Sequence, residues 1–236
     1  MATRGAFVIV GGGFAGAKAA ETLRASGFAG PVVLVGTEPD RPYERPPLSK
    51  EILRGEAEDS SAFVHPEDYY SEHDIELRLD TAVTSIDTAA ATVSTADGES
   101  IGYERLLIAT GAEPRRLDVK GSDLDGIHYL RTLADSQDLR TALRSATRLA
   151  VVGAGWIGSE VAASARQLGV DVALIDPMSA PLVRVLGPEL GQVYLDLHRE
   201  HGVSLHMDTG VAGFAGDHAA HAVVTREACN ACIHVE

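Results

Sequence analysis

The sequence has little cysteine, no excess of basic residues and no long apolar run. Its two cysteines, Cys229 and Cys232, lie among the last eight residues, so no disulfide braces the body of the chain. The net charge of −14 argues against nucleic acid and anionic membrane surfaces as partners, because both attract clustered Lys and Arg. No apolar run approaches the length of a membrane span.

The N-terminus also lacks the pattern of a signal peptide. The letters MATRGAFVIV lead directly into an apolar stretch typical of a strand, which leaves no room for a cleaved leader. We therefore expect a cytoplasmic protein. With 236 residues, 45% of them hydrophobic, the chain can form one large or two small domains, each with its own core.

A glycine-rich turn lies between two predicted strands near the N-terminus. The apolar runs at 6–10 and 31–36 are typical of strands buried on both faces of a parallel sheet, and a helical repeat lies between them. The turn reads GGGFAG and supplies Gly11, Gly13 and Gly16 at the spacing of a dinucleotide-binding fingerprint.

Each glycine of this fingerprint has a physical role. The first permits the tight turn, the second lets the backbone approach a pyrophosphate, and the third lets the helix pack close to the strand. The free amides and the positive dipole end of the helix then point at the phosphate. Glu38, just past the second strand, is placed to accept hydrogen bonds from a ribose.

The same pattern recurs 142 residues later, counted from Gly11 to Gly153. Residues 148–177 repeat the order of strand, glycine turn, helix and strand. A lone glycine fingerprint also fits a tight turn without a ligand, but two complete copies favour a flavin and a nicotinamide that exchange a hydride. The second turn reads GAGWIG and contributes the candidate nicotinamide-binding residues Gly153, Gly155, Trp156, Ile157 and Gly158.

The acid after the second turn bears on the choice of nicotinamide. Asp176 ends the following strand and would hold the 2′-hydroxyl of NAD while repelling the 2′-phosphate of NADP. Arg184 is close enough in sequence to leave NADP open. The sequence favours NAD.

Further motifs lie around the two turns. Four prolines crowd residues 39–47, and the loop ends at Lys50. We expect amphipathic helices at 134–145 and 188–202 and a buried strand within 105–114, whereas residues after about 217 show no clear period.

These motifs resemble those of a known family when they are taken in order. The motifs that carry the resemblance are the two glycine fingerprints, PPLSK after the first acid, LLIATGAEPR, YLRT and GAGWIGSEVA. Through them the chain resembles the FAD-dependent NAD(P)H:ferredoxin and rubredoxin reductases, a branch of the pyridine nucleotide-disulfide oxidoreductases. The resemblance runs from about residue 6 to residue 216. It implies an α/β fold with two Rossmann-like three-layer domains that bind FAD and NAD(P).

The resemblance also implies which residues act. Lys50 would lie beside the isoalloxazine, where positive charge faces the flavin locus that becomes anionic on reduction. Glu160 would lie near the nicotinamide, and an ion pair between the two across the domain cleft is expected. We take Lys50 and Glu160 as the candidate catalytic residues. Without the resemblance, Lys50 reads as a solvated loop lysine and Glu160 as a helix-surface acid.

Other positions match cofactor contacts of the family, and we predict no metal site. For one of them, Val83, the resemblance implies a contact with the adenine, and without the resemblance it reads as a plain core valine. The matching positions are Ala15 and Gly16 at the pyrophosphate turn, Glu38 at the adenosine ribose, Arg45 and Lys50 beside the flavin, Val83 at the adenine, the segment Ala109, Thr110 and Gly111, and Arg131 between the domains.

The family comparison also assigns meaning to the absence of cysteine. Disulfide reductases on this scaffold carry a cysteine pair on the helix after the first glycine turn, where this chain reads PPLSKEILRGEAE. Electrons would therefore leave the flavin directly. The CNAC letters at 229–232 lack a preceding strand and a following helix, so we interpret them as coincidence.

Family members are considerably longer than this chain. We expect an FAD-binding domain at 1–113, an NAD(P)-binding domain at 114–216 and an irregular tail at 217–236, with both domains incomplete at the C-terminal side and apolar sheet edges left open. The leading function passes hydride from NADH to FAD and single electrons to a ferredoxin or rubredoxin. The alternatives are a flavoprotein that reduces oxygen, a quinone or nitrite reductase, and a catalytically silent nucleotide-binding fragment.

Overall fold

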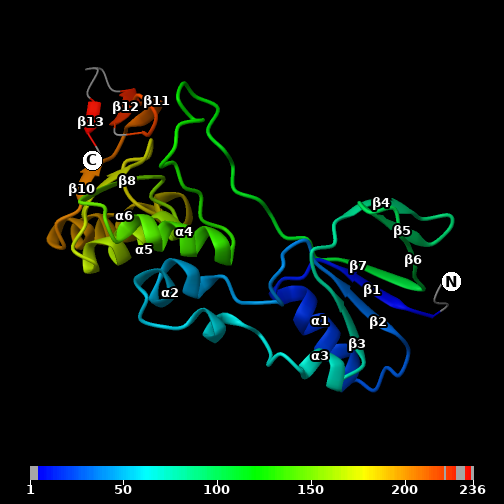
Figure 1. Ribbon diagram of the computed structural model, residues 1–236. Coiled ribbons are helices and arrows are strands. Elements are labelled where there is room, and N and C mark those ends of the chain that lie inside the picture. The colour runs from blue at the N-terminus through cyan, green and yellow to red at the C-terminus, as the bar shows by residue number, and fades with distance from the viewer. Residues whose placement is uncertain (1–4, 221, 227–231, 235–236) are drawn as a thin grey trace. The chain divides into compact units, whose positions relative to one another are not determined.

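The computed structural model describes residues 5–220, 222–226 and 232–234 (Figure 1). The chain divides into two compact units. The first comprises the residues up to Glu44 together with Ser60–Glu113, and the second comprises Arg45–Asp59 together with the residues from Pro114 onward. The proline-rich loop is therefore divided between the units. Pro39 and Pro42 belong to the first unit, whereas Pro46, Pro47 and Lys50 belong by their contacts to the second, which the sequence did not indicate.

A parallel sheet of four strands forms the centre of the first unit, with the order β3-β2-β1-β7. Phe7 of β1 stands opposite Val32 of β2 on one side and Arg105 of β7 on the other. The elements of this unit are β1 (Phe7–Val10), α1 (Phe14–Ala25), β2 (Val32–Val35), α3 (Tyr69–Glu72), β3 (Ile75–Arg78), β4 (Val83–Asp87), β5 (Thr92–Thr95), β6 (Ser100–Gly102) and β7 (Arg105–Ile108). The short helix η2 (Asp59–Ala62) spans the boundary between the two units.

The side chains of β1 and β2 alternate between the two faces of this sheet, as the period of a strand requires. Val8 and Val10 pack with Val93 of the antiparallel sheet β4-β5-β6. Ile9 packs with Ala20 of α1 on the opposite face. The apolar run at 6–10 is thus buried on both sides, and the unit has the three layers that the sequence predicted.

A second parallel sheet, with the order β10-β9-β8, supports the second unit. Leu174 of β9 and Val161 of α5 belong to one buried cluster, which also takes in Leu53, three residues past the proline-rich loop. The elements are η1 (Pro46–Ser49), α2 (Glu51–Arg54), α4 (Leu133–Leu143), β8 (Arg148–Val152), α5 (Trp156–Gln167), β9 (Asp171–Ile175), α6 (Val183–Glu200), β10 (Ser204–His206), β11 (Gly210–Ala215), β12 (Ala222–Arg226) and β13 (Cys232–His234).

Regular structure continues past residue 216, where we expected an irregular tail. Strands β11, β12 and β13 form an antiparallel sheet, and Phe214 stands opposite Val223. The conformation of such short strands depends on pairing with neighbouring strands more than on the residues themselves. The sequence of this segment therefore shows no clear period. Most of the CNAC letters, including Cys229, lie outside the described residues.

Two sheet edges are apolar and exposed, as the sequence led us to expect. Among the described strands, β7 pairs only with β1, and β8 pairs only with β9. Leu107 and Ile108 of β7 and Val152 of β8 are exposed. None of the helices within the described ranges combines the length and the apolar composition needed to cross a bilayer.

Helix α6 begins earlier than the predicted start at residue 188. Gly187 has a φ of 81° and joins a short first part to the part that Pro188 opens. Proline suits the first position of a helix because its missing N–H would have no partner there. The helix buries His198 against the unit, and burial, with a smaller contribution from His201, lowers the pKa of His198.

This lowered pKa predicts a loss of stability in acid. Because the pKa of His198 is lower in the folded chain than in the unfolded chain, the unfolded chain takes up this proton first as the pH falls, so the free energy of unfolding decreases below about pH 6.5. We expect His198→Leu to flatten that fall by up to about 1.4 kcal/mol per pH unit. Urea unfolding between pH 5 and 7 measures it, with His218→Gln, at an exposed histidine, as control. An unchanged slope in His198→Leu would contradict the assignment.

Candidate functional site

The first glycine turn joins β1 to α1 at the carboxyl end of the parallel sheet. Gly11 has a φ of +128°, and a Cβ there would lie 2.1 Å from the carbonyl oxygen of Ala109. Glycine therefore lets the segment after β7 pass directly against the turn. Because β2 and β7 leave β1 on opposite sides, this point is the crevice in which open α/β sheets bind their ligands.

Gly16 and Gly13 differ in what an added side chain would meet. A Cβ at Gly16 would lie 2.1 Å from the carbonyl oxygen of Gly11, so helix and turn can meet only at glycine. A Cβ at Gly13 would meet no protein atom within 4 Å, and the φ of −93° suits any residue. Neither packing nor strain explains glycine at position 13. The open space in front of α1 fits a group that approaches the backbone closely.

The N-terminus of α1 is available to an anion. Gly13 is its N-cap, no side chain caps the helix, and its first turn, which contains Ala15, carries no acidic residue. The first amides of a helix have no partner within it, and its dipole favours negative charge at this end. The turn can therefore hold a pyrophosphate, as the fingerprint predicts.

Three further predicted positions lie by the same end of the sheet. Ala109 and Thr110 abut Gly11, and the amide of Ala109 donates to the carbonyl of Val10 at 2.7 Å. Gly111 follows in an exposed, left-handed conformation with a φ of 74°. The ATG segment thus lies beside the first glycine turn.

Glu38 follows β2 and is held by a tyrosine that sequence reasoning did not single out. The hydroxyl of the buried Tyr43 donates to Oε2 of Glu38. A carboxylate has about four acceptor positions, so Glu38 keeps capacity for a ribose hydroxyl. Val83, by contrast, packs partly buried against the core cluster of the first unit, as a plain core valine would. Its contact with adenine stays a prediction.

The second glycine turn repeats this geometry between β8 and α5. A Cβ at Gly158 would lie 1.8 Å from the carbonyl oxygen of Gly153, whereas a Cβ at Gly155 would meet nothing within 4 Å. Gly155 is the N-cap of α5, again without a side-chain cap or an acidic first turn. Trp156 and Ile157 open the helix and are about half exposed. The second turn thus has the same open space for a phosphate.

Asp176 supports the second turn directly. Its Oδ2 accepts from the amide of Ala154 at 2.6 Å, and its Oδ1 accepts from the amide of Met178 at 2.8 Å. The carboxylate therefore fixes the backbone of the turn, and its role as acceptor for the ribose of NAD stays a prediction. Arg184 donates to the sulfur of Met178.

The predicted ion pair between Lys50 and Glu160 is confirmed. The Nζ of Lys50 lies 2.8 Å from Oε1 of Glu160 and also donates to the carbonyl of Pro46 at 2.9 Å. Both partners belong to the second unit, so the pair does not join the two units as we expected. The reason is that the residues around Lys50 pack on the second unit. The side chain of Leu53 lies in the buried cluster of that unit, and the carbonyl of Leu48 accepts from the hydroxyl of Ser136 at 2.8 Å.

Arg45 and Arg131 also meet within the second unit. Arg45 donates to the carbonyl of Arg131, and the amide of Arg131 donates to Asp135 at 2.9 Å. The Nε of Arg131 is a buried donor without a hydrogen-bond partner among the described residues. A buried donor without a hydrogen bond costs stability, so this position fits an acceptor from a bound cofactor.

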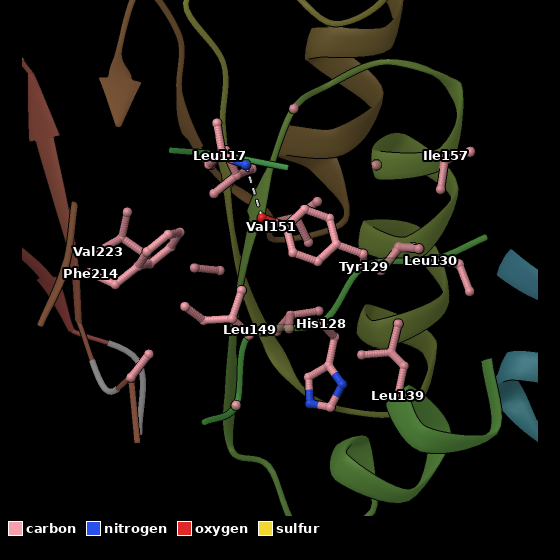
Figure 2. Close-up of a pocket in the computed structure, with 18 of the residues that line it drawn as sticks. Leu117, His128, Tyr129, Leu130, Leu139, Leu149, Val151, Ile157, Phe214 and Val223 are labelled. Carbon is pink, nitrogen blue, oxygen red and sulfur yellow. Dashed lines mark hydrogen bonds between the residues drawn. The ribbon is translucent and has the colours of Figure 1, made fainter. Parts of the chain in front are cut away.

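A cavity of about 480 Å³ lies along β8 in the second unit, and sequence reasoning missed it. Figure 2 shows apolar side chains around it, with the hydroxyl of Tyr129 accepting from the amide of Leu117. Gly153 and Gly158 of the second turn border the same cavity. The lining comes from several stretches of the chain between Arg115 and Val223, so no local motif could have revealed it. Residues that line it include His128, Tyr129, Leu139, Leu149, Phe214 and Val223.

Comparison with known proteins gives a consistent result. A family profile described as pyridine nucleotide-disulphide oxidoreductase matches residues 5–231. Rhodocoxin reductase of Rhodococcus erythropolis is 43% identical over 204 residues, which are 86% of this chain and 48% of that protein. The ferredoxin–NAD(+) reductase subunit of the benzene 1,2-dioxygenase system of Pseudomonas putida is 42% identical over 209 residues, 89% of this chain and 51% of that protein.

Solved structures agree with these relatives. The structure of a covalent putidaredoxin reductase–putidaredoxin complex contains a chain that is 37% identical, with a TM-score of 0.94, over 99% of this chain and 57% of that one. A ferredoxin reductase of Rhodopseudomonas palustris is 32% identical, with a TM-score of 0.93, over 98% and 56% respectively. The chain thus spans about half the length of the proteins that it matches.

Proposed function

The chain belongs to the pyridine nucleotide-disulphide oxidoreductase family, and from that premise we propose that it is an FAD-dependent oxidoreductase of the cytoplasm. Hydride would pass from NADH to FAD, and single electrons would pass to a ferredoxin- or rubredoxin-type acceptor. Two of its relatives are named as a rhodocoxin reductase and a ferredoxin–NAD(+) reductase subunit, which supports the choice of acceptor.

One observation carries this proposal. The chain holds two helix N-termini, each with an uncapped first turn and a glycine whose missing side chain faces open space. Two such sites, in strand–turn–helix units with an acid after the second strand, suit two dinucleotides. Bound FAD would supply the step between a two-electron donor and a one-electron acceptor.

The protein's own groups would bind and orient the two cofactors. The amides of α1 and α5 would hold the pyrophosphates of FAD and NADH, and Glu38 and Asp176 would accept from their riboses. Arg131 would donate its free Nε to FAD. Lys50 would place positive charge beside the flavin, where the reduced ring is anionic, and Glu160 would keep that lysine oriented.

The visible absorption spectrum of the purified chain tests the proposal. We expect a flavin band, present on purification or acquired with added FAD, that bleaches when NADH is added without oxygen, because both sites then act together. A ferredoxin-reduction assay beside an NADH oxidase assay identifies the acceptor. A band that does not bleach would contradict the second site. A colourless chain that takes up no FAD would overturn the proposal in favour of a silent nucleotide-binding fragment.

A further inference from the structure

Two neighbouring residues of the proline-rich segment hold the carboxylate of Glu160. Lys50 contacts Oε1 through its Nζ at 2.8 Å, and Ser49 donates its hydroxyl to Oε2 at 2.5 Å. Both carboxylate oxygens therefore have a donor, and the side chain is restricted to one orientation. The lysine side of this arrangement is partly exposed, at 38% for Lys50 and 29% for Glu160.

Ser49 is itself fixed from the helix that carries Glu160. The hydroxyl of Ser164 donates to the carbonyl of Ser49 at 2.7 Å, and Nη1 of Arg54 donates to the hydroxyl of Ser164 at 3.2 Å. Glu160 and Ser164 stand four residues apart on α5 and so share one face of the helix. The helix thus binds Ser49 at two points, through its side chain and through its carbonyl.

Both serines are buried, with exposed fractions of 3% for Ser49 and 1% for Ser164. A third buried serine, Ser136 of α4, donates to the carbonyl of Leu48, the residue before Ser49, at 2.8 Å. Proline at positions 46 and 47 restricts the backbone of η1 further. Ser49 is therefore a rigid point, whereas Lys50 is a long side chain at the surface.

An exposed ion pair holds two side chains only weakly, since such pairs contribute roughly 0–1 kcal/mol. The orientation of Glu160 thus depends on the buried donor, Ser49, more than on Lys50. We propose that Ser49 is a positioning residue, supported by Ser164, that sets the geometry of the Lys50–Glu160 pair. Its role in the reductase reaction rests on the function proposed above.

Lysine labelling gives a direct test, because the chain has only three lysines, Lys18, Lys50 and Lys120. Nitrogen-15 labelling of their side chains yields three ammonium signals. The signal of Lys18, which pairs with Glu21 in the first unit, serves as an internal reference. In Ser49→Ala we expect hydrogen exchange of the Lys50 ammonium to accelerate about tenfold. The Lys18 and Lys120 signals should stay unchanged.

Matched variants separate positioning from packing. Glu160→Gln removes the charge that holds Lys50 and should accelerate its exchange at least as much as Ser49→Ala. Ser164→Ala keeps the Ser49 hydroxyl but removes its support, and we expect a smaller acceleration. Ser145→Ala, at an exposed serine whose hydroxyl donates to the carbonyl of Ala142 at the end of α4, should change nothing.

Two outcomes would overturn the inference. A folded Ser49→Ala chain with unchanged Lys50 exchange would show that the serine only packs. If Ser49→Ala does not fold, Ser49→Cys keeps the volume with a weaker donor, and the same acceleration is required of it. In chain loaded with FAD, Ser49→Ala should also slow flavin reduction by NADH about tenfold while FAD affinity is unchanged. Failure of the unaltered chain to bind FAD would contradict the proposed function and leave the lysine result standing.

Discussion

The Gly16→Ala chain is expected to lose the fold of its first unit. The added Cβ would lie 2.1 Å from the carbonyl oxygen of Gly11 and 3.0 Å from Cδ1 of Leu34. The carbonyl cannot yield easily, because the amide of Gly11 is bonded to Val35 of the neighbouring strand at 2.8 Å. We expect a loss of more than about 3 kcal/mol of stability, since a single methyl must displace fixed backbone.

The second unit offers the same experiment. A Cβ at Gly158 would lie 1.8 Å from the carbonyl oxygen of Gly153, so Gly158→Ala should destabilise that unit by a similar amount. Urea unfolding followed by circular dichroism measures both variants. Gly13→Ala is the matched control, because it adds the same methyl where no protein atom lies within 4 Å. Equal midpoints for Gly16→Ala and Gly13→Ala would refute the close approach of helix and turn.

The second large effect concerns binding instead of folding. Gly13→Ala should keep the fold, at a cost of about 1 kcal/mol for the poorer helix cap. It should weaken FAD binding about a hundredfold, because the methyl occupies the space in front of α1 and separates a charged phosphate from two or more amides. Titration of the chain with FAD, followed by the quenching of flavin fluorescence, measures the change in affinity.

Gly155→Ala completes the design in the second turn. It should leave FAD affinity unchanged and weaken NADH binding about a hundredfold for the same reason. Each variant is thus the control for the other. If Gly155→Ala weakened FAD and spared NADH, the assignment of the two turns would have to be reversed. If neither variant changed either affinity, the open spaces would not be cofactor sites.

The local parts of the fold could be predicted because their signals are local. Strand, glycine turn and helix follow one another within about twenty residues, and the glycine spacing records contacts such as that between Gly16 and Gly11. Proline at position 188 also indicated where the main part of α6 begins. The boundaries shifted by a few residues, because helix ends depend on caps and kinks that hydrophobic period does not describe.

Parts of the candidate site were less accessible to sequence reasoning. Asp176 was chosen as an acceptor for ribose, yet its two oxygens also accept from the backbone of the turn. The cavity along β8 draws residues from Leu117 to Val223, and no short pattern joins them. Strand β12 had no readable period because its pairing with β11 decides its conformation.

The two glycine turns of the dinucleotide-binding type and the membership of the pyridine nucleotide-disulphide oxidoreductases could be recognised from the sequence alone, because those features lie in residue types at fixed short spacings. Two features became clear only from the folded structure: residues 45–50 pack with the second unit, and Ser49 holds Glu160. Those two residues are 111 positions apart. Contacts at that separation are fixed by which apolar surfaces meet on folding, and a single sequence carries no local record of that choice.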